Sequence, residues 1–243
     1  KGLLMPRMTN AQRLAIASPV AGLIVYCTNC GANGEMVIYN GTSWVNMVGD
    51  AAASFTVISS TGKTWMDRNL GATQVATSST DAASYGDLYQ WGRNSDGHES
   101  RTSGTATGPL ASGSEGANFI TTNSTPYDWL STQDGTRWNG STKGTHDPCP
   151  NGFRVPTEAE WEAERASFAP DNAAGAFASV LKLPLAGNRN FSNGTIYVVG
   201  SDGYYWSSTV SGTIARNLIF NSTNATMIAN YRAYGFSVRC IKE

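Results

Sequence analysis

The stretch 94–146 most constrains the fold of this chain, because Ser, Thr, Gly and Asn dominate it without helical or strand periodicity. Loops this long are uncommon inside a compact domain, so the segment either carries function or belongs to an unusual, loop-rich fold. Trp129 and Trp138 interrupt the polar sequence, and we expect them to pin it to a core. The sequence therefore predicts a domain of short elements joined by long loops.

Within that domain only one segment strongly predicts a helix. Thr157 is a typical N-cap, Pro156 precedes it, and Glu160 stands three residues on as the partner of a capping box. The glutamates of this helix occupy alternate positions from 158 to 164, so they do not converge on one site and predict a solvated face. A second helix is expected at AAGAFASVLKL, residues 173–183.

Residues 1–50 follow a different pattern. Thr9 is a candidate N-cap for a short helix over 11–18, and Ser18 followed by Pro19 ends it. Two apolar, β-branched segments, 22–28 and 35–40, predict strands, and 41–47 predicts a third. The result is a small helix-plus-β-meander unit, too short for a deep core, which we expect to pack on other surfaces. We place the boundary in the small, polar linker 49–54.

Composition excludes several classes of partner. Only 14% of the residues are charged and the formal net charge is −1, so the chain lacks the basic surface that nucleic acid requires. No apolar stretch approaches the roughly 20 residues that span a bilayer, so we expect no membrane insertion.

The four cysteines form two unlike pairs. Cys27 and Cys30 stand in CTNC, followed by a turn sequence, which favours a disulfide or two unpaired thiols over a metal or redox site. Cys149 and Cys240 lie far apart in the sequence, and for them we favour a structural disulfide over free thiols. A disulfide there implies an oxidising, extracytoplasmic setting.

Residues suited to catalysis or metal binding are sparse. The two histidines, His98 and His146, stand in different loop segments, and we interpret His98 as an exposed loop residue. The nucleophile-elbow, zinc-protease, phosphate-loop and dinucleotide motifs are all missing from the sequence. Asp67 and Asp87 could each hold a structural Ca²⁺ or an ion pair, but we predict neither a metal site nor a cofactor.

A series of motifs resembles a known family. In order they are WMDRNLGATQVATS, YGDLYQWGR, DPCPNGFRVPTEAEWE, LPLAGNR, YYWSST and FSVRCIK. Together they resemble the bacterial major paralogous domain family first described from Fibrobacter, over residues 55–243. The resemblance implies an α+β, C-type-lectin-like domain, related to formylglycine-generating and sulfatase-modifying proteins, with small twisted antiparallel sheets, two helices and long loops. It also implies that Cys240 bonds to Cys149. The first 26 residues resemble segments of bacterial surface proteins and phage tail fibres.

The C-terminal part, about 188–240, resembles the variable region of proteins targeted by diversity-generating retroelements. In those proteins adenines are randomised, so Asn codons can become Ser, Thr, Ile, Ala, Asp, Tyr or Phe, but not Lys, Glu, Gln, Trp or Met. The twelve positions that we select as candidate ligand-binding residues all obey this rule: Ile196, Tyr197, Asp202, Tyr204, Thr213, Ile214, Ile219, Thr226, Ile228, Ala229, Asn230 and Tyr234.

An alternative is that the apolar residues among these twelve are ordinary core contacts. This interpretation suits Ile219, between Leu218 and Phe220, better than Ile228 or Tyr234. Other residues of the same stretch have a size or charge typical of a scaffold: Trp206, Leu218, Phe220, Arg232, Phe236, Val238 and Cys240.

These observations favour a binding protein over an enzyme. The hypothesis is a receptor-binding protein or adhesin with an N-terminal attachment unit, 1–50, and a ligand-binding domain, 51–243, that displays a hypervariable surface. Its expected partner is a protein or glycan on a cell surface, its location extracellular, on a bacterial surface or a phage virion, and its N-terminal unit could form a homo-oligomer. The alternatives are a non-diversified cell-surface module and, further off, an oxidase of the formylglycine-generating type.

Overall fold

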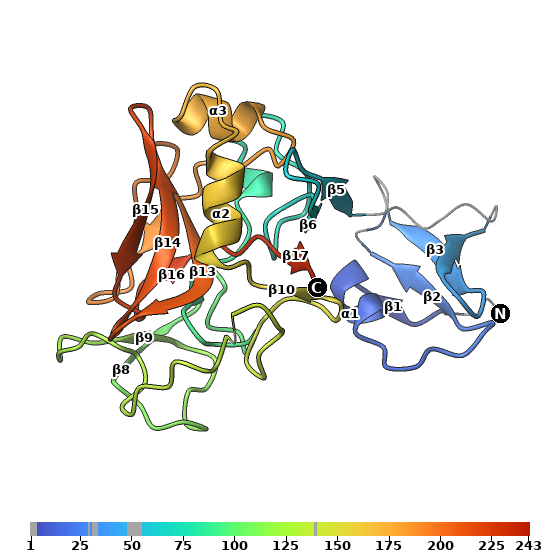
Figure 1. The fold of residues 1–243 in the computed structure, drawn as a ribbon. Coiled ribbons are helices and arrows are strands. Elements are labelled where there is room, and N and C mark those ends of the chain that lie inside the picture. The colour runs from blue at the N-terminus through green and yellow to red at the C-terminus, as the bar shows by residue number, and fades with distance from the viewer. Residues whose placement is uncertain (1–3, 29, 31–33, 48–54, 139) are drawn as a thin grey trace. The chain divides into compact units, whose positions relative to one another are not determined.

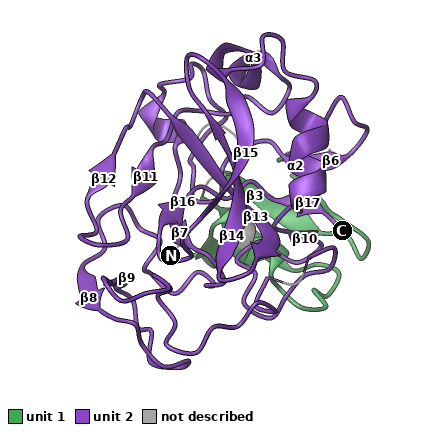
Figure 2. Cartoon of the chain, turned by 60° about the vertical axis from the view of Figure 1, so that its left-hand side comes forward, with its two compact units in different colours: residues 1–55 green, residues 56–243 purple. Residues whose placement is uncertain are grey.

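The computed structural model describes all residues except 1–3, 29, 31–33, 48–54 and 139. The chain divides into two compact units, unit 1 (Lys1–Phe55) and unit 2 (Thr56–Glu243), coloured separately in Figure 2. The boundary expected at residue 50, within the linker 49–54, falls outside the described residues.

Unit 1 is a four-stranded sheet with one short helix. Its elements are β1 (Arg7–Met8), α1 (Asn10–Leu14), β2 (Ile24–Cys27), β3 (Glu35–Tyr39) and β4 (Trp44–Asn46), and the strands follow the order β1-β2-β3-β4. The three expected strands are present, together with β1, which pairs in parallel with β2. The helix expected over 11–18 begins at Asn10 and ends at Leu14, and Ser18, with a positive φ of 53°, lies outside the helical region.

One face of this sheet carries the core of unit 1. Val25, Cys27, Cys30 and Val37 are buried together, and Cys27 and Cys30 form a disulfide. Helix α1 lies on this face, because the guanidinium of Arg13 stacks 5.3 Å from the ring centroid of Trp44, which packs on the same cluster. Few residues are fully buried, as expected for so small a unit.

Unit 2 is a mixed α+β domain of small sheets, few helices and long connections (Figure 1). Its described elements are β5 (Thr56–Ile58), β6 (Thr64–Met66), the 3₁₀ turn Ala82–Ser84, β7 (Tyr89–Gln90), β8 (Thr105–Thr107), β9 (Phe119–Thr121), β10 (Phe153–Arg154), α2 (Glu158–Arg165), α3 (Ala173–Ala178), β11 (Asn188–Arg189), β12 (Ile196–Tyr197), β13 (Gly203–Ser211), β14 (Ile214–Phe220), β15 (Ala225–Asn230), β16 (Gly235–Phe236) and β17 (Ile241–Lys242).

These strands form four sheets within the described part of unit 2: β10-β17-β6-β5, β12-β11-β16-β7, β13-β14-β15 and β8-β9. The first three are antiparallel, as expected, whereas β8 and β9 pair in parallel. A segment of 11 residues separates β8 from β9, long enough for the chain to return in the same direction.

Helix α2 begins as the sequence predicts. The Thr157 hydroxyl accepts a hydrogen bond from the Glu160 amide, and the Glu160 carboxylate accepts one from the Thr157 amide, which completes the capping box. The solvated glutamate face was a wrong prediction. Glu164 is buried and accepts a hydrogen bond from Ser59 at 2.5 Å, and Glu160 also binds Arg154 at 2.6 Å, because α2 packs against neighbouring segments on more than one side. Helix α3 is shorter than the expected 173–183.

Tryptophan side chains tie the loop-rich segment to the core, as the sequence predicts. Trp129 and Trp138 are buried. The indole of Trp129 donates to the Trp91 carbonyl at 2.7 Å, and that of Trp138 donates to the His146 carbonyl at 2.8 Å. Each ring is therefore buried, and its indole N–H also donates a hydrogen bond to a backbone carbonyl oxygen.

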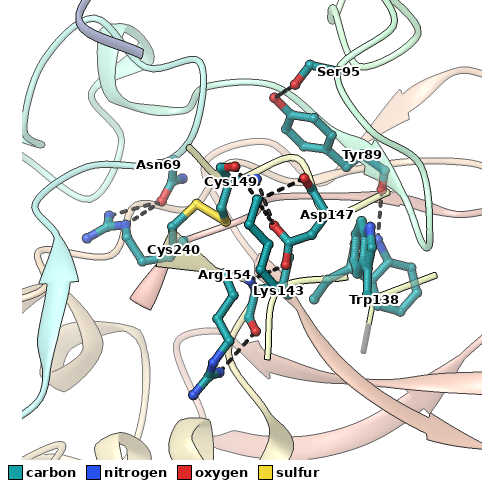
Figure 3. Close-up of a disulfide and its surroundings, with 12 residues drawn as sticks. Asn69, Tyr89, Ser95, Trp138, Lys143, Asp147, Cys149, Arg154 and Cys240 are labelled. Atoms are coloured by element: carbon teal, nitrogen blue, oxygen red, sulfur yellow. Dashed lines mark hydrogen bonds and ion pairs between the residues drawn. A yellow bond between two sulfur atoms is a disulfide. The ribbon is translucent and has the colours of Figure 1, made fainter. Parts of the chain in front are cut away.

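A disulfide joins Cys149 to Cys240, the pair that the resemblance implied, across 91 positions (Figure 3). Beside it Asp147 accepts hydrogen bonds from the amides of Cys149 and Val155, both at 2.8 Å, and an ion pair from Lys143 at 3.0 Å. The loop before α2 is thus fixed to the terminal strand. Among the described residues, no helix is long and apolar enough to cross a membrane.

Candidate ligand-binding site

The sheet β13-β14-β15 has two faces of different character. One face, here called the helix face, packs against α2, which lies over it in Figure 1. In the register, Leu218 stands opposite Tyr205 on one side and Met227 on the other. The ring of Trp161, from α2, lies 5.6 Å from that of Tyr205. The helix face is defined by the side chains Tyr205, Leu218, Phe220, Ala225 and Met227.

The other face, here called the pocket face, carries the alternate residues. Tyr204, Ile219 and Thr226 form one row across the three strands, since directly opposed residues of antiparallel strands share a face. Ile228 and Asn230 continue the same face along β15. None of these five side chains is fully buried.

A cavity of about 430 Å³ lies at the pocket face, a volume in the range of small-ligand sites. The neighbouring sheet contributes its other walls, because β11 pairs with both β12 and β16. Ten residues line it: Asn188, Asn190, Tyr197, Val198, Tyr204, Ile219, Ile228, Asn230, Tyr234 and Phe236.

Aromatic packing holds the floor of this pocket in place. Phe236 is buried, and its ring lies 4.3 Å from that of Trp206, between centroids. Tyr204 and Tyr234 pack against the same cluster, with ring centroids 4.9 Å and 5.4 Å from that of Phe236. Their phenol ends are thus carried on a rigid base, the arrangement that limits the entropy lost when a ligand binds.

Amide groups supply the polar part of the pocket. Asn188 is only 8% exposed, yet its side-chain amide makes no hydrogen bond with any described residue. Asn230 donates one hydrogen bond to Asn217 at 2.9 Å, which leaves its oxygen for another partner. An amide held in a pocket without a protein partner is a group that a ligand can satisfy.

The pocket carries no formal charge. Its ten lining residues include no carboxylate, amine, guanidinium or imidazole. Burial, and secondarily the Asp202 carboxylate, raises the pKa of the Tyr204 phenol, and burial and Tyr231 raise the pKa of Tyr234. Both phenols therefore stay neutral at physiological pH and act as hydrogen-bonding groups.

The segment 197–199 forms an apolar rim. Tyr197, Val198 and Val199 are 44%, 43% and 45% exposed. Val198 has a positive φ of 52°, rare for a β-branched residue, and a side chain on Gly187 would lie 2.3 Å from the Tyr197 carbonyl. Close backbone approach at Gly187 thus sets the position of the rim.

Further aromatic residues, which are not among the twelve candidates, extend from the pocket. Phe191 lies 4.8 Å from Tyr234 and 5.3 Å from both Tyr127 and Tyr231, measured between ring centroids. Tyr231 is 38% exposed. Tyr127 comes from the long loop segment, so only the folded chain brings it beside the C-terminal residues.

The twelve candidate residues divide by location. Six line the pocket: Tyr197, Tyr204, Ile219, Ile228, Asn230 and Tyr234. Thr226 shares the pocket face without lining the cavity, whereas Ile214 and Ala229 belong to the opposite face of the sheet by register. Asp202 and Thr213 lie at strand ends, and Ile196 pairs with Arg189 at the sheet edge.

Burial separates the candidates from the scaffold residues of the same stretch. Each of the twelve side chains is at least partly exposed. The seven expected scaffold residues are all buried: Trp206, Leu218, Phe220, Arg232, Phe236, Val238 and Cys240. The pocket also uses Asn188, Asn190 and Val198, which the sequence analysis did not single out, although the first two stand in the AGNRN motif.

His98 is buried, so its interpretation as an exposed loop residue was wrong. Its Nε2 accepts a hydrogen bond from the Gln90 amide at 3.0 Å, and its Nδ1 lies 2.7 Å from Asp96. Asp96, His98 and Glu99 lie close enough to hold an ion together, but both ring nitrogens are already engaged. Burial lowers the pKa of His98 to about 4, so the ring is neutral and orders its loop.

Asp67 and Asp87, the two aspartates considered as calcium ligands, have different surroundings. Asp67 forms an ion pair with the adjacent Arg68 at 2.8 Å. Burial, with the nearby Glu99 carboxylate, raises the pKa of Asp87 to about 6, and its carboxylate packs against Gly71. Among the described residues neither belongs to a group suited to hold a metal.

Comparison with protein families gives two partial matches. Residues 1–66 match the phage tail like trimerisation region, and residues 165–241 match a domain of unknown function (DUF8237). The first match covers unit 1 and continues through β6, and the second contains the whole pocket. Neither a curated protein nor a solved structure matches the chain. The N-terminal match links the chain to phage tail-like proteins.

Proposed function

We propose that unit 2 is a diversified ligand-binding module, on a C-type-lectin-like scaffold, in a receptor-binding protein or adhesin of a phage virion or bacterial surface. The observation that carries the proposal is the division within 196–240. The twelve candidate residues are all at least partly exposed and six of them converge on one pocket, while the seven scaffold residues are buried. A diversification system can change such positions without unfolding the domain.

The pocket's chemistry favours an uncharged ligand group. A charged group would lose its hydration there without meeting an opposite charge on the lining residues. Tyrosine rings and aliphatic side chains offer contact area, and Asn188, Tyr204 and Tyr234 offer hydrogen bonds, the same division of labour as in antibody paratopes. A neutral glycan unit or an uncharged protein side chain on a cell surface meets these requirements.

We propose a binder rather than an enzyme, without a cofactor. The lining residues offer no residue that commonly serves as a general acid or base at neutral pH, and burial raises the pKa of Tyr204 and Tyr234 further. The oxidase alternative needs a free thiol pair, whereas all four cysteines are in disulfides. A non-diversified surface module is the remaining alternative.

The match of residues 1–66 to a phage tail like trimerisation region supports the attachment role proposed for the N-terminal part. The two disulfides are compatible with an extracellular location.

A paired set of variants tests the binding role. Tyr204→Ser and Ile228→Ser change the pocket face within the codon rule, and Ile214→Ser changes the opposite face. Protein and glycan arrays probed with the full chain should give signals that the first two variants abolish and the third retains. Equal signals from all three, or no signal from the full chain, would contradict the proposal.

A further inference from the structure

Unit 1 has a second sheet face that its own core does not use. Because side chains alternate along a strand, the residues between the buried positions of β2 and β3 point to the side away from the core. Two cross-strand rows lie there. Ile24, Ile38 and Val45 form one, and Tyr26 and Met36 form the other, next to Arg7 of β1. We call Ile24, Tyr26, Met36, Ile38 and Val45 the outer face.

The outer face is apolar but belongs to none of the core clusters of the described residues. All five side chains are partly exposed, and none of them packs against the cluster of Val25, Cys27, Cys30 and Val37. The helix of the unit cannot cover them, since Arg13 of α1 stacks on Trp44 at the opposite face. Apart from the disulfide-bonded cysteines, only Val25 and Val37 are fully buried in the described core of unit 1. The outer face thus carries more apolar side chains than this core.

Charge does not oppose association through this face. Arg7 is the one charged residue in the two rows, and its guanidinium lies 4.7 Å from the ring centroid of Tyr26. A cation stacked on an aromatic ring at the sheet edge can remain hydrated while the rest of the face is buried.

We infer that the outer face is the surface through which three copies of this chain associate. Residues 1–66 match a trimerisation region, which identifies the occupant as further copies of the same chain. Three such faces around a threefold axis would enclose one apolar core, which gives each small unit the burial that it lacks alone. The inference does not depend on ligand binding by unit 2.

The test compares charge introduced on the outer face with charge introduced elsewhere. The variant Ile24→Asp/Ile38→Asp places two carboxylates in the centre of the proposed interface, and Val20→Asp, at a residue 75% exposed, is the matched control. Sedimentation equilibrium of the full chain should give a trimer for the wild type and the control. The double variant should dissociate at least about a hundredfold more readily.

Methionine oxidation in the unmodified chain provides a measurement that needs no substitution. Met36 lies on the outer face and is partly exposed in the single chain. Peroxide should oxidise Met36 slowly at concentrations where the chain is trimeric, and Met36 should lose this protection on dilution to monomer. A monomeric wild type, a trimeric double variant, or Met36 oxidation that ignores dilution would each overturn the inference.

Circular dichroism of the double variant distinguishes a failure to fold from a loss of trimer contacts. Circular dichroism and retention of array binding by unit 2 should match the wild type, because the substituted side chains lie outside every core cluster of the described residues. Loss of the trimer with unchanged binding supports the inference and leaves the proposed function intact, whereas loss of binding with an intact trimer affects only the proposed function.

Discussion

The two faces of the sheet β13-β14-β15 are built from the same strands, yet they place opposite demands on their side chains. On the helix face Leu218 and Tyr205 are buried against α2, so shape decides which residue is accepted. On the pocket face Ile219 and Ile228 are partly exposed around a cavity, so many side chains fit. Alternation along a strand thus lets one element serve stability and recognition separately.

The largest expected difference between the faces is in stability. Leu218→Ala should lower the free energy of unfolding of unit 2 by about 2–5 kcal/mol, because it leaves a cavity in the packed helix face. The neighbouring Ile219→Ala should cost only about 1 kcal/mol, since that side chain keeps contact with solvent. Chemical denaturation followed by fluorescence measures both, and equal costs would remove the distinction.

Leu218 and Ile219 also illustrate which features could be predicted from the sequence alone. The buried scaffold residues, the capping box at Thr157 and the three strands of unit 1 follow from local chemistry, and the structure contains them. The codon rule, in contrast, is blind to direction. It selected Ile214 and Ile219 together, although their positions in β14 differ by an odd number and they therefore face opposite sides.

Register and long-range packing account for the remainder of the site. A register irregularity between Trp206 and Val210 interrupts the alternation of β13, which the sequence does not announce. Asn188 enters the pocket because β11 pairs with both β12 and β16, and Tyr127 reaches the aromatic group from a loop without periodicity. These approaches depend on the whole fold of unit 2, and no local motif encodes them.

For ligand binding, we expect substitutions on the pocket face to have larger effects than substitutions on the helix face. Tyr234→Ala should weaken ligand binding about thirtyfold or more, the effect of removing a central aromatic anchor. Isothermal titration with the ligand found on the arrays measures the affinity. The control, Ile214→Ala, should bind like the wild type, and a similar loss there would mean that the pocket face has no special role.

A smaller effect is expected at the pocket's unpartnered amide. Asn188→Ala should weaken binding about five- to tenfold, the value of one ligand hydrogen bond, because the amide makes no hydrogen bond with the described residues. For the same reason the thermal transition of unit 2 should not fall. A drop in thermal stability without a change in affinity would assign Asn188 to the scaffold instead.

The smallest expected effect is that of pH. Burial raises the pKa of Tyr204 and of Tyr234 above their usual value near 10, so both phenols keep their protons throughout the neutral range. The ten lining residues include no carboxylate, amine, guanidinium or imidazole. Affinity for an uncharged ligand should therefore be constant from about pH 5 to about pH 9, and a step in a titration series would reveal a charged partner.

The central claim is tested most directly by sequencing the DNA around the coding region in sibling isolates. The account predicts a near-identical template repeat beside a reverse transcriptase, with differences only at template adenines. Protein changes should concentrate at Tyr204, Ile228 and Tyr234 and spare Leu218 and Phe220. Absence of the repeat, or changes spread equally over the buried helix face, would contradict it.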